Sequence, residues 1–270
     1  MVGGTDPRPV GMFDSGLGGL TVARAFIDLL PHEDLIYFGD TARCPYGPRP
    51  VEEIREFSLE ITDYLVAQGV KLVVVACNAA ESSAFYEATG RYDVPIVTVI
   101  EPGVRAAIAA TRNRRIGLIG TEATIKSRAY EVAVDRTKAN VELISQACPK
   151  FVEFVESGDT TSDALLGAAE DYLLPLKEAG IDTLILGCTH YPLLSGVIQY
   201  VMGDDVVLVS SAEPTANDVY GRLLESESLN RRDELGELRF ILSGDTDPTL
   251  GRRFLGPDFT DFEYRTWERP

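Results

Sequence analysis

The chain has 270 residues, of which 45% are hydrophobic, and this is enough for one large domain or two compact ones with full cores. Its formal net charge is −17, from 42 acidic and 25 basic residues, which disfavours nucleic acid as a main partner because phosphate backbones would be repelled. No apolar run approaches the ~20 residues of a membrane span, and residues 1–10 lack the pattern of a secretory signal, so we expect a cytoplasmic protein without membrane association.

The cysteine and histidine content argues against two kinds of structural site. The chain has two histidines, His32 and His190, and four cysteines without CxxC spacing: Cys44, Cys77, Cys148 and Cys188. Four cysteines in a chain of this length are too few for a disulfide framework, and a reducing cytosol keeps them as thiols. We therefore expect neither disulfides nor a metal site.

The first predicted element is a strand that ends in Asp14-Ser15, followed by a turn with glycines at positions 16, 18 and 19. Such a turn could bind a dinucleotide, and Asp40 lies near the usual distance for a ribose contact. However, Thr21 stands where the third glycine of that motif belongs, and Asp14 would repel a pyrophosphate. Asp14 is better suited to a ligand that carries an ammonium group.

The next segment, residues 41–50, is predicted to be a loop that contains Pro45-Tyr46-Gly47-Pro48. The prolines make the loop rigid, and it offers the Tyr46 hydroxyl and backbone amides to a carboxylate. An ordinary turn is the alternative interpretation. Cys44 in this loop, and Cys148 elsewhere, have no neighbours that indicate a reactive thiol.

A helix, a glycine and a buried strand follow this loop. Residues 51–68 have apolar side chains at helical spacing, Gly69 marks the end of the helix, and residues 70–76 are mostly apolar except for Lys71. A strand that is apolar on both faces is typical of a parallel sheet covered by helices on both sides. Cys77 stands directly after this strand.

The same arrangement returns in the second half of the chain. Gly180 precedes another apolar strand, residues 183–186, and Cys188 lies 8 residues past Gly180 just as Cys77 lies 8 residues past Gly69. Other segments of the two halves match at offsets of 106 to 112 residues. A repeat this long, with helices and strands alternating inside it, indicates two similar α/β units rather than a short-repeat solenoid.

The predicted fold class is therefore α/β, with two domains that are each a mostly parallel sheet flanked by helices. The first domain spans residues 1–100, the second spans residues 101–212, and residues 213–270 are expected to pack back on the first. Parallel sheets bind ligands at the carboxyl ends of their strands. Two such units that face each other would place Cys77 and Cys188 in one cleft between them.

Polar residues follow both of these cysteines. A single cysteine after a strand is most often a small core side chain. Here the position recurs, with Asn78 after Cys77 and with Thr189-His190 after Cys188. A thiol at a strand-to-helix junction lies near the positive end of the helix dipole, which predicts a lowered pKa and a populated thiolate. His190 can stabilise the thiolate of Cys188 or relay its proton.

Four motifs, in order along the chain, resemble those of the glutamate racemases in the aspartate/glutamate racemase superfamily. They are Phe13-Asp14-Ser15-Gly16-Leu17-Gly18-Gly19, Gly39-Asp40-Thr41-Ala42-Arg43 through Pro45-Tyr46-Gly47-Pro48, Ala76-Cys77-Asn78, and Leu186-Gly187-Cys188-Thr189-His190-Tyr191-Pro192. The resemblance extends from near Val10 to Pro214.

This resemblance implies two pseudo-symmetric domains, commonly assembled as a homodimer, and a cofactor-independent racemase that makes D-glutamate for peptidoglycan. It assigns the proton of D-glutamate to Cys77 and that of L-glutamate to Cys188, with Asp14 supporting the first thiol, His190 supporting the second, and Glu156 as a further acid near the cleft. It also implies a set of substrate-binding positions: Asp14, Ser15, Tyr46, Gly47, Asn78, Ala79, Thr121, Thr124, Thr189 and His190.

The chemistry of racemisation agrees with two thiols and no cofactor. Inverting a Cα centre requires removing a proton from one face and delivering one to the other, so two acid/base groups in opposite protonation states must flank the carbon. The carbanionic transition state needs fixed donors, a task for Asn78, Thr189 and nearby backbone amides. Pyridoxal phosphate would need a Schiff-base lysine, and none of the five lysines is placed like one.

One residue departs from the family pattern, and several alternatives stay open. Ala79 follows Asn78 where the family usually has Thr or Ser, so a hydroxyl that would reach the substrate is missing. Aspartate and hydantoin racemases share the two cysteines and differ in the pocket. Cys188 with His190 could form a hydrolytic pair, although Cys77 would then be unexplained. Some family members bind and inhibit DNA gyrase, which leaves an interaction protein on a racemase scaffold as a non-catalytic alternative.

Overall fold

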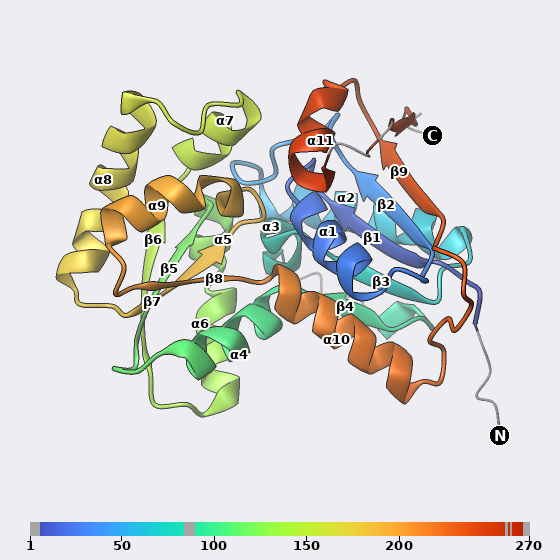
Figure 1. Cartoon of the computed structure of the whole chain (residues 1–270), viewed down its shortest axis with the longest axis horizontal. Coiled ribbons are helices and arrows are strands. Elements are labelled where there is room, and N and C mark those ends of the chain that lie inside the picture. Colours follow the sequence, from blue (N-terminus) through green and yellow to red (C-terminus); the bar gives the residue numbers. More distant parts are fainter. Residues whose placement is uncertain (1–5, 84–89, 257–258, 260, 267–270) are drawn as a thin grey trace.

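The computed structural model describes residues 6–83, 90–256, 259 and 261–266, and the first five residues of the N-terminal stretch considered for a secretory signal lie outside this range. The described residues form two β-sheets flanked by helices, one on each side of the molecule in Figure 1. We call the part around the six-stranded sheet the first unit and the part around the four-stranded sheet the second unit. No described helix is both long and apolar enough to cross a lipid bilayer.

Both sheets are parallel throughout their described strands. The first has the order β10-β9-β2-β1-β3-β4, with β1 (Val10–Asp14), β2 (Leu35–Gly39), β3 (Leu72–Val75), β4 (Ile96–Thr98), β9 (Leu238–Leu242) and β10 (Glu263–Tyr264). The second has the order β6-β5-β7-β8, with β5 (Arg115–Gly120), β6 (Glu142–Ala147), β7 (Thr183–Gly187) and β8 (Val207–Ser210). The run β2-β1-β3-β4 thus has the same topology as the whole second sheet, as a duplicated unit predicts.

Helices cover both faces of each sheet. On the first sheet, one face carries α1 (Leu20–Leu29), α10 (Ala212–Glu225) and α11 (Pro248–Leu255), and the other carries α2 (Val51–Ala67) and α3 (Asn78–Ser82). On the second sheet, one face carries α7 (Lys150–Glu156), α8 (Asp163–Glu178), α9 (Ser195–Met202) and the 3-10 helix η2 (Tyr191–Leu194), and the other carries α4 (Ile100–Ala110) and α6 (Ala129–Thr137). The helix α5 (Glu122–Ser127) contacts α3 across the units. The predicted fold class is confirmed.

The central strands are buried on both faces, which explains their uninterrupted apolar sequence. Along β3, Leu72 and Val74 pack in the core beneath α1, whereas Val73 and Val75 pack in the core beneath α2. Successive side chains of a strand point to opposite faces, so each face of the sheet receives every second residue. The expected strand with helices on both sides is therefore present.

Two glycines end the helices that precede β3 and β7. Gly69 has φ +78 and Gly180 has φ +72, a left-handed conformation that glycine adopts without strain. The helix-glycine-strand pattern that recurs in the sequence corresponds to a backbone turn that recurs in the structure.

The chain beyond β8 returns to the first unit. The helix α10 packs against α1, β9 pairs with β2, and β10 pairs with β9. The elements α11 and β10 were not predicted, because they are short and their sequence has no clear period; Phe259 between them packs against Phe240, with ring centroids 5.4 Å apart. We keep the domain boundaries, residues 1–100 with 213–270 and residues 101–212, as a proposal.

Lys71, the charged residue in the apolar run before Cys77, forms a buried ion pair. Its Nζ lies 2.6 Å from Oε2 of Glu33, and both side chains are only 1% exposed. The ammonium also donates to the carbonyl oxygens of Asp6 and Ser228, each at 2.8 Å. Removing one partner of such a pair leaves the other charge buried without compensation.

We predict that Lys71→Met lowers the free energy of unfolding by about 3 to 5 kcal/mol, because the Glu33 carboxylate loses its cation. Urea unfolding followed by circular dichroism measures this change. Arg91→Met is the control, since it breaks an exposed pair with Asp63 and should change the free energy of unfolding by less than about 1 kcal/mol. An equally small change for Lys71→Met would contradict the prediction.

Candidate active site

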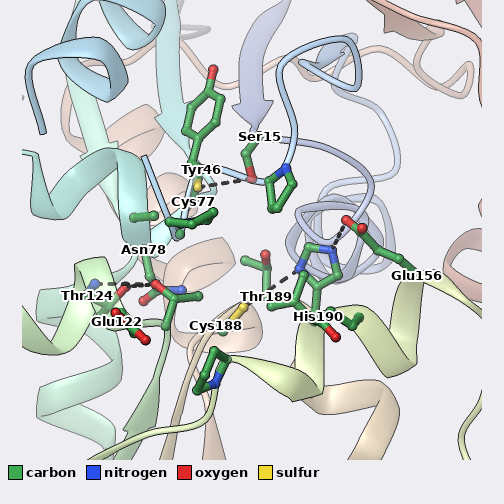
Figure 2. Close-up of a pocket in the computed structure, with 18 residues that line it drawn as sticks. Ser15, Tyr46, Cys77, Asn78, Glu122, Thr124, Glu156, Cys188, Thr189 and His190 are labelled. Carbon is green, nitrogen blue, oxygen red and sulfur yellow. Dashed lines mark hydrogen bonds and ion pairs between the residues drawn. The ribbon is translucent and has the colours of Figure 1, made fainter. Parts of the chain in front are cut away.

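A cavity of about 230 Å³ lies between the two units, near the carboxyl ends of β1, β3, β5 and β7. Side chains of both units point into it in Figure 2. The first unit contributes Ser15, residues 45–48 and residues 77–79, and the second contributes Thr121, Glu122, Thr124, Pro149, Val152, Glu153, Glu156 and residues 188–190. Every predicted site residue except Asp14 lines this cavity, and Cys77 and Cys188 meet in it.

Cys77 caps the start of α3 and is almost fully buried, with 4% of its surface exposed. Its Sγ lies 3.6 Å from the hydroxyl of Ser15. Burial, together with the nearby carboxylate of Asp14, raises the pKa of the Cys77 thiol well above its ordinary value. The expectation that a helix dipole lowers this pKa is wrong for Cys77, because α3 has only 5 residues and the burial outweighs its contribution.

Cys188 begins a chain of polar contacts that crosses to the first unit. Its Sγ lies 3.7 Å from Nδ1 of His190, and the other ring nitrogen, Nε2, lies 3.5 Å from Oε1 of Glu156. The same carboxylate oxygen accepts a hydrogen bond from the thiol of Cys44 at 3.1 Å. Dashed lines in Figure 2 mark the contacts of His190 with Cys188 and Glu156.

These contacts set the charge on His190. Burial alone would lower the pKa of the imidazole, but its interactions with Cys188 and Glu156 outweigh this and raise the pKa to about 10. Burial would raise the pKa of Glu156, yet hydrogen bonds from His190 and Cys44 bring it below its ordinary value. At neutral pH the pair is therefore an imidazolium and a carboxylate, and the imidazolium lies beside the sulfur of Cys188.

The glycine-rich turn after β1 serves the contact between the two units. A Cβ at Gly18 would lie 2.5 Å from both Nδ1 of His190 and Oγ1 of Thr189, and a Cβ at Gly19 would lie 2.5 Å from Cβ of Asp14. A side chain at Gly18 would push the Cys188 loop away from β1, and one at Gly19 would displace Asp14. The turn is thus explained by close packing, and the dinucleotide hypothesis is not needed for it.

Asp14 lies behind the wall of the cavity and is fully buried. Its carboxylate accepts hydrogen bonds from the amide of Gly16 at 2.9 Å and from the hydroxyl of Thr189 at 3.2 Å. Burial raises the pKa of this carboxyl despite the opposing effect of the His190 charge. Asp14 therefore connects the end of β1 to the Cys188 loop, and a ligand in the cavity would meet it only through its neighbours.

The loop at residues 45–48 differs from expectation in one respect. The Tyr46 side chain is buried, and its hydroxyl donates to Oδ2 of Asp40 at 2.5 Å instead of facing the cavity. Asp40 also accepts hydrogen bonds from Ser243 and Arg43, at 2.8 Å and 2.6 Å. This carboxylate anchors the loop, which leaves the backbone amides, and not the Tyr46 hydroxyl, available to a carboxylate ligand.

Thr121 and Thr124 form the wall on the side of the second unit. Their hydroxyl oxygens lie 3.1 Å apart, and the amide of Thr124 donates to Thr121 Oγ1, which caps the start of α5. A Cβ at Gly47 would lie 3.1 Å from Cβ of Thr121, so the rigid loop of the first unit touches this wall. The described residues contain no group of three or more His, Cys, Asp or Glu side chains arranged for a metal ion.

Cys44 is a site residue that the sequence did not reveal. Its contact with Glu156 joins residues 112 positions apart, and no local pattern predicts such a pair. Cys148 lies in the core of the second unit, with its Sγ 3.7 Å from the carbonyl oxygen of Gln146, which agrees with a structural cysteine.

The sequence and the fold are both similar to those of known racemases. The profile of the Asp/Glu/Hydantoin racemase family matches residues 20–218. The chain is 55% identical over 267 residues to a glutamate racemase of Beutenbergia cavernae, which covers 94% of this chain and 91% of that protein. Among solved structures it is similar to a glutamate racemase from Bacillus anthracis (TM-score 0.90, 38% identity, 97% of each chain) and to that of Francisella tularensis in complex with D-glutamate (TM-score 0.89, 32% identity, 97% of this chain and 98% of that one).

We predict that His190 stays protonated well above neutral pH, because Cys188 and Glu156 stabilise its cation. Its imidazole NMR signals, identified by their loss in His190→Gln, should titrate with a midpoint near pH 10. Because the pKa of His190 is higher in the folded state than the unfolded value of 6.5, protonation of His190 stabilises the fold. This contribution is fully present below pH 6.5 and is lost as pH rises toward 10. Glu156→Gln should lower the midpoint; a wild-type midpoint near 6.5 would overturn the assignment.

Proposed function

This chain belongs to the Asp/Glu/hydantoin racemase family, and we propose that it interconverts L-glutamate and D-glutamate with two cysteine thiols and no cofactor. The observation that carries the proposal is the presence of Cys77 and Cys188 in one cavity, each after the equivalent strand of its unit. Thiols that enter a cavity from opposite units are arranged to reach opposite faces of one carbon. The glutamate complex of a similar racemase supports glutamate as the substrate.

The imidazolium of His190 beside Cys188 and the raised pKa of Cys77 suit the direction from L-glutamate to D-glutamate. The Cys188 thiolate, next to the His190 imidazolium, takes the α-proton of L-glutamate. Cys77, whose raised pKa keeps it a thiol, delivers its own proton to the opposite face. The carbon is inverted, Cys188 ends as a thiol and Cys77 as a thiolate, and exchange with solvent restores the starting state.

In the reverse direction the two cysteines exchange tasks. Cys77 must then act as a base. Burial and the Asp14 carboxylate raise the pKa of its thiol, and its thiolate is therefore a strong base. Asp14 acts on Cys77 through charge and on the Cys188 loop through Thr189. Glu156 holds the His190 cation in place, so that Cys188 is a competent acid when it returns its proton.

The remaining residues of the cavity bind the substrate. Removal of the α-proton places negative charge on the α-carboxylate, and the donors for this charge are Ser15, Asn78 and the backbone amide of Thr189, because the Thr189 hydroxyl donates to Asp14. The side-chain carboxylate of glutamate is met by the backbone amides of Tyr46 and Gly47, since the prolines at 45 and 48 carry no N–H, and by the hydroxyls of Thr121 and Thr124. In this assignment Tyr46 contributes its backbone, since its hydroxyl is bonded to Asp40.

We further propose that the D-glutamate supplies peptidoglycan synthesis in the cytoplasm and that the chain works as a homodimer. The resemblance to the glutamate racemases is the support for both statements. Binding to DNA gyrase stays an alternative that rests on the resemblance alone.

An isotope experiment tests the two-base mechanism. With L-glutamate in D₂O, the early D-glutamate should carry deuterium at Cα while the recovered L-glutamate stays largely protiated, because one thiol keeps the departing proton and the other delivers a deuteron from solvent. Proton NMR of the two resolved enantiomers measures both pools. Equal entry of deuterium into both pools from the outset would point to a single shared base.

L-Aspartate in the same assay should turn over far more slowly.

Cysteine variants serve as the controls for this experiment. Cys77→Ala and Cys188→Ala should each abolish racemisation in a folded protein, since each thiol serves one face of the carbon. Cys148→Ala is the matched control because its side chain is equally buried but lies in the core of the second unit, and it should keep its activity. Retention of more than a few per cent of activity in either active-site variant would contradict the mechanism.

A second prediction concerns Ala79, which is buried in the cavity wall where the family usually has a hydroxyl. Ala79→Thr should raise kcat/KM, because a hydrogen bond to a charged group contributes about 1.5 to 3 kcal/mol, or about tenfold to a hundredfold. We expect the lower end of this range, since a water molecule can replace part of the bond. Ala79→Val adds the same volume without the hydroxyl and should bring no gain. An unchanged or lower kcat/KM in the threonine variant would show that the cavity has adapted to alanine.

A further inference from the structure

Tyr130 of the second unit makes a hydrogen bond to the residue that follows Cys77. It lies on α6, its side chain is fully buried, and its hydroxyl donates to Oδ1 of Asn78 at 2.7 Å. Burial raises the pKa of the Tyr130 hydroxyl well above its ordinary value, so the group keeps its proton and acts as a donor. The bond therefore connects the second unit to the catalytic loop of the first.

The ring of the same tyrosine lies against the residue that precedes Cys188. A Cβ at Gly187 would be 3.4 Å from Cε2 of Tyr130, so the ring packs on the bare backbone at the end of β7. A single side chain thus touches the neighbours of both cysteines, Asn78 through its hydroxyl and Gly187 through its ring.

The hydrogen bond also fixes which way the Asn78 amide faces. With Oδ1 held by Tyr130, the donor Nδ2 lies on the other side of the amide group. Asn78 lines the cavity and is 3% exposed, and Nδ2 has no hydrogen-bond partner among the described residues. A buried amide nitrogen without an acceptor is costly, and an acceptor group on a ligand in the cavity would remove this cost.

We propose that Tyr130 is a positioning residue for racemisation: its hydroxyl holds the Asn78 amide with Nδ2 directed at the substrate carboxylate, and its ring sets the position of the Cys188 loop. The inference rests on the proposed function for the identity of the substrate. The carboxylate gains negative charge as the α-proton leaves, so a donor held in place by Tyr130 is more effective in the transition state than in the ground state.

A double-mutant cycle tests whether Tyr130 acts through Asn78. Tyr130→Phe removes only the hydroxyl and should lower kcat/KM about tenfold, mostly through kcat. In an Asn78→Ala background the same substitution should change kcat/KM by less than about twofold, because the group that it positions is gone. Equal effects in both backgrounds would overturn the proposal.

Tyr191→Phe separates positioning from a loss of stability. Tyr191 is also fully buried in the second unit, and its hydroxyl donates to the carbonyl oxygen of Cys148 at 2.9 Å. Both variants lose one buried hydrogen bond, so similar decreases in Tm are expected, while Tyr191→Phe should keep kcat/KM within about twofold of the wild type. The same loss of kcat in both variants would make the effect of Tyr130→Phe a general one and refute the proposal.

NMR of the Asn78 side chain gives a readout that does not depend on activity. The ¹⁵N–¹H signals of its amide, identified by their loss in Asn78→Ala, should shift in Tyr130→Phe and stay in place in Tyr191→Phe. Unchanged signals in Tyr130→Phe would refute the proposal. If the wild-type protein did not racemise glutamate, the proposed function would fail, and these signals would by themselves decide whether Tyr130 holds Asn78.

Discussion

The close approach of the two units at Gly18 is the constraint on which the site depends. A side chain there would collide with His190 and Thr189, whose loop carries Cys188. Because Gly18 has none, this loop reaches the end of β1, where Thr189 bonds to the buried carboxylate of Asp14. The second thiol can share a cavity with the first only when the loop lies in this position.

Hydrogen bonds and close packing both join the two units around the cavity. The buried members of the four hydrophobic clusters divide between the units, two clusters to each. Three hydrogen bonds that cross near the cavity are Thr189 to Asp14, Cys44 to Glu156, and Tyr130 to Asn78. Each of them ends on a residue next to a cysteine or on a residue that supports one. The hydrogen bonds that join the two units therefore also position the residues of the site.

Burial changes the pKa values on the two sides of the cavity in opposite directions: it raises the pKa of the Cys77 thiol, and by itself it would lower the pKa of the His190 imidazole. On the first side, burial and then the nearby carboxylate of Asp14 raise the pKa of Cys77, and they outweigh the opposite effect of the Ser15 hydroxyl. On the second side, the anionic neighbours of His190 raise the pKa of the imidazole in spite of burial, which places a cation beside Cys188. The two thiols therefore lie in different electrostatic surroundings, with an anion near Cys77 and a cation beside Cys188.

The sequence by itself determined the fold class and the two cysteines, because these follow from local patterns and from a repeat. Apolar strands, the glycines at 69 and 180, and the equal spacing to Cys77 and Cys188 can all be found along the chain. The family resemblance added most of the other residues of the cavity wall, but not Glu122, Pro149, Val152 and Glu153. It also did not reveal that the Tyr46 hydroxyl is bonded to Asp40.

Only the tertiary structure decided the electrostatics of the site and the contacts between its two halves. The pKa of Cys77 depends on how much water its thiol loses and on a carboxylate brought close by folding, which no helix-dipole argument contains. Cys44 meets Glu156, and Tyr130 meets Asn78, across 112 and 52 positions of the chain. Such pairs arise from the docking of two units, which depends on the shape of whole surfaces. The spacing of residues along the chain indicates only which residues are neighbours within one element or one repeat.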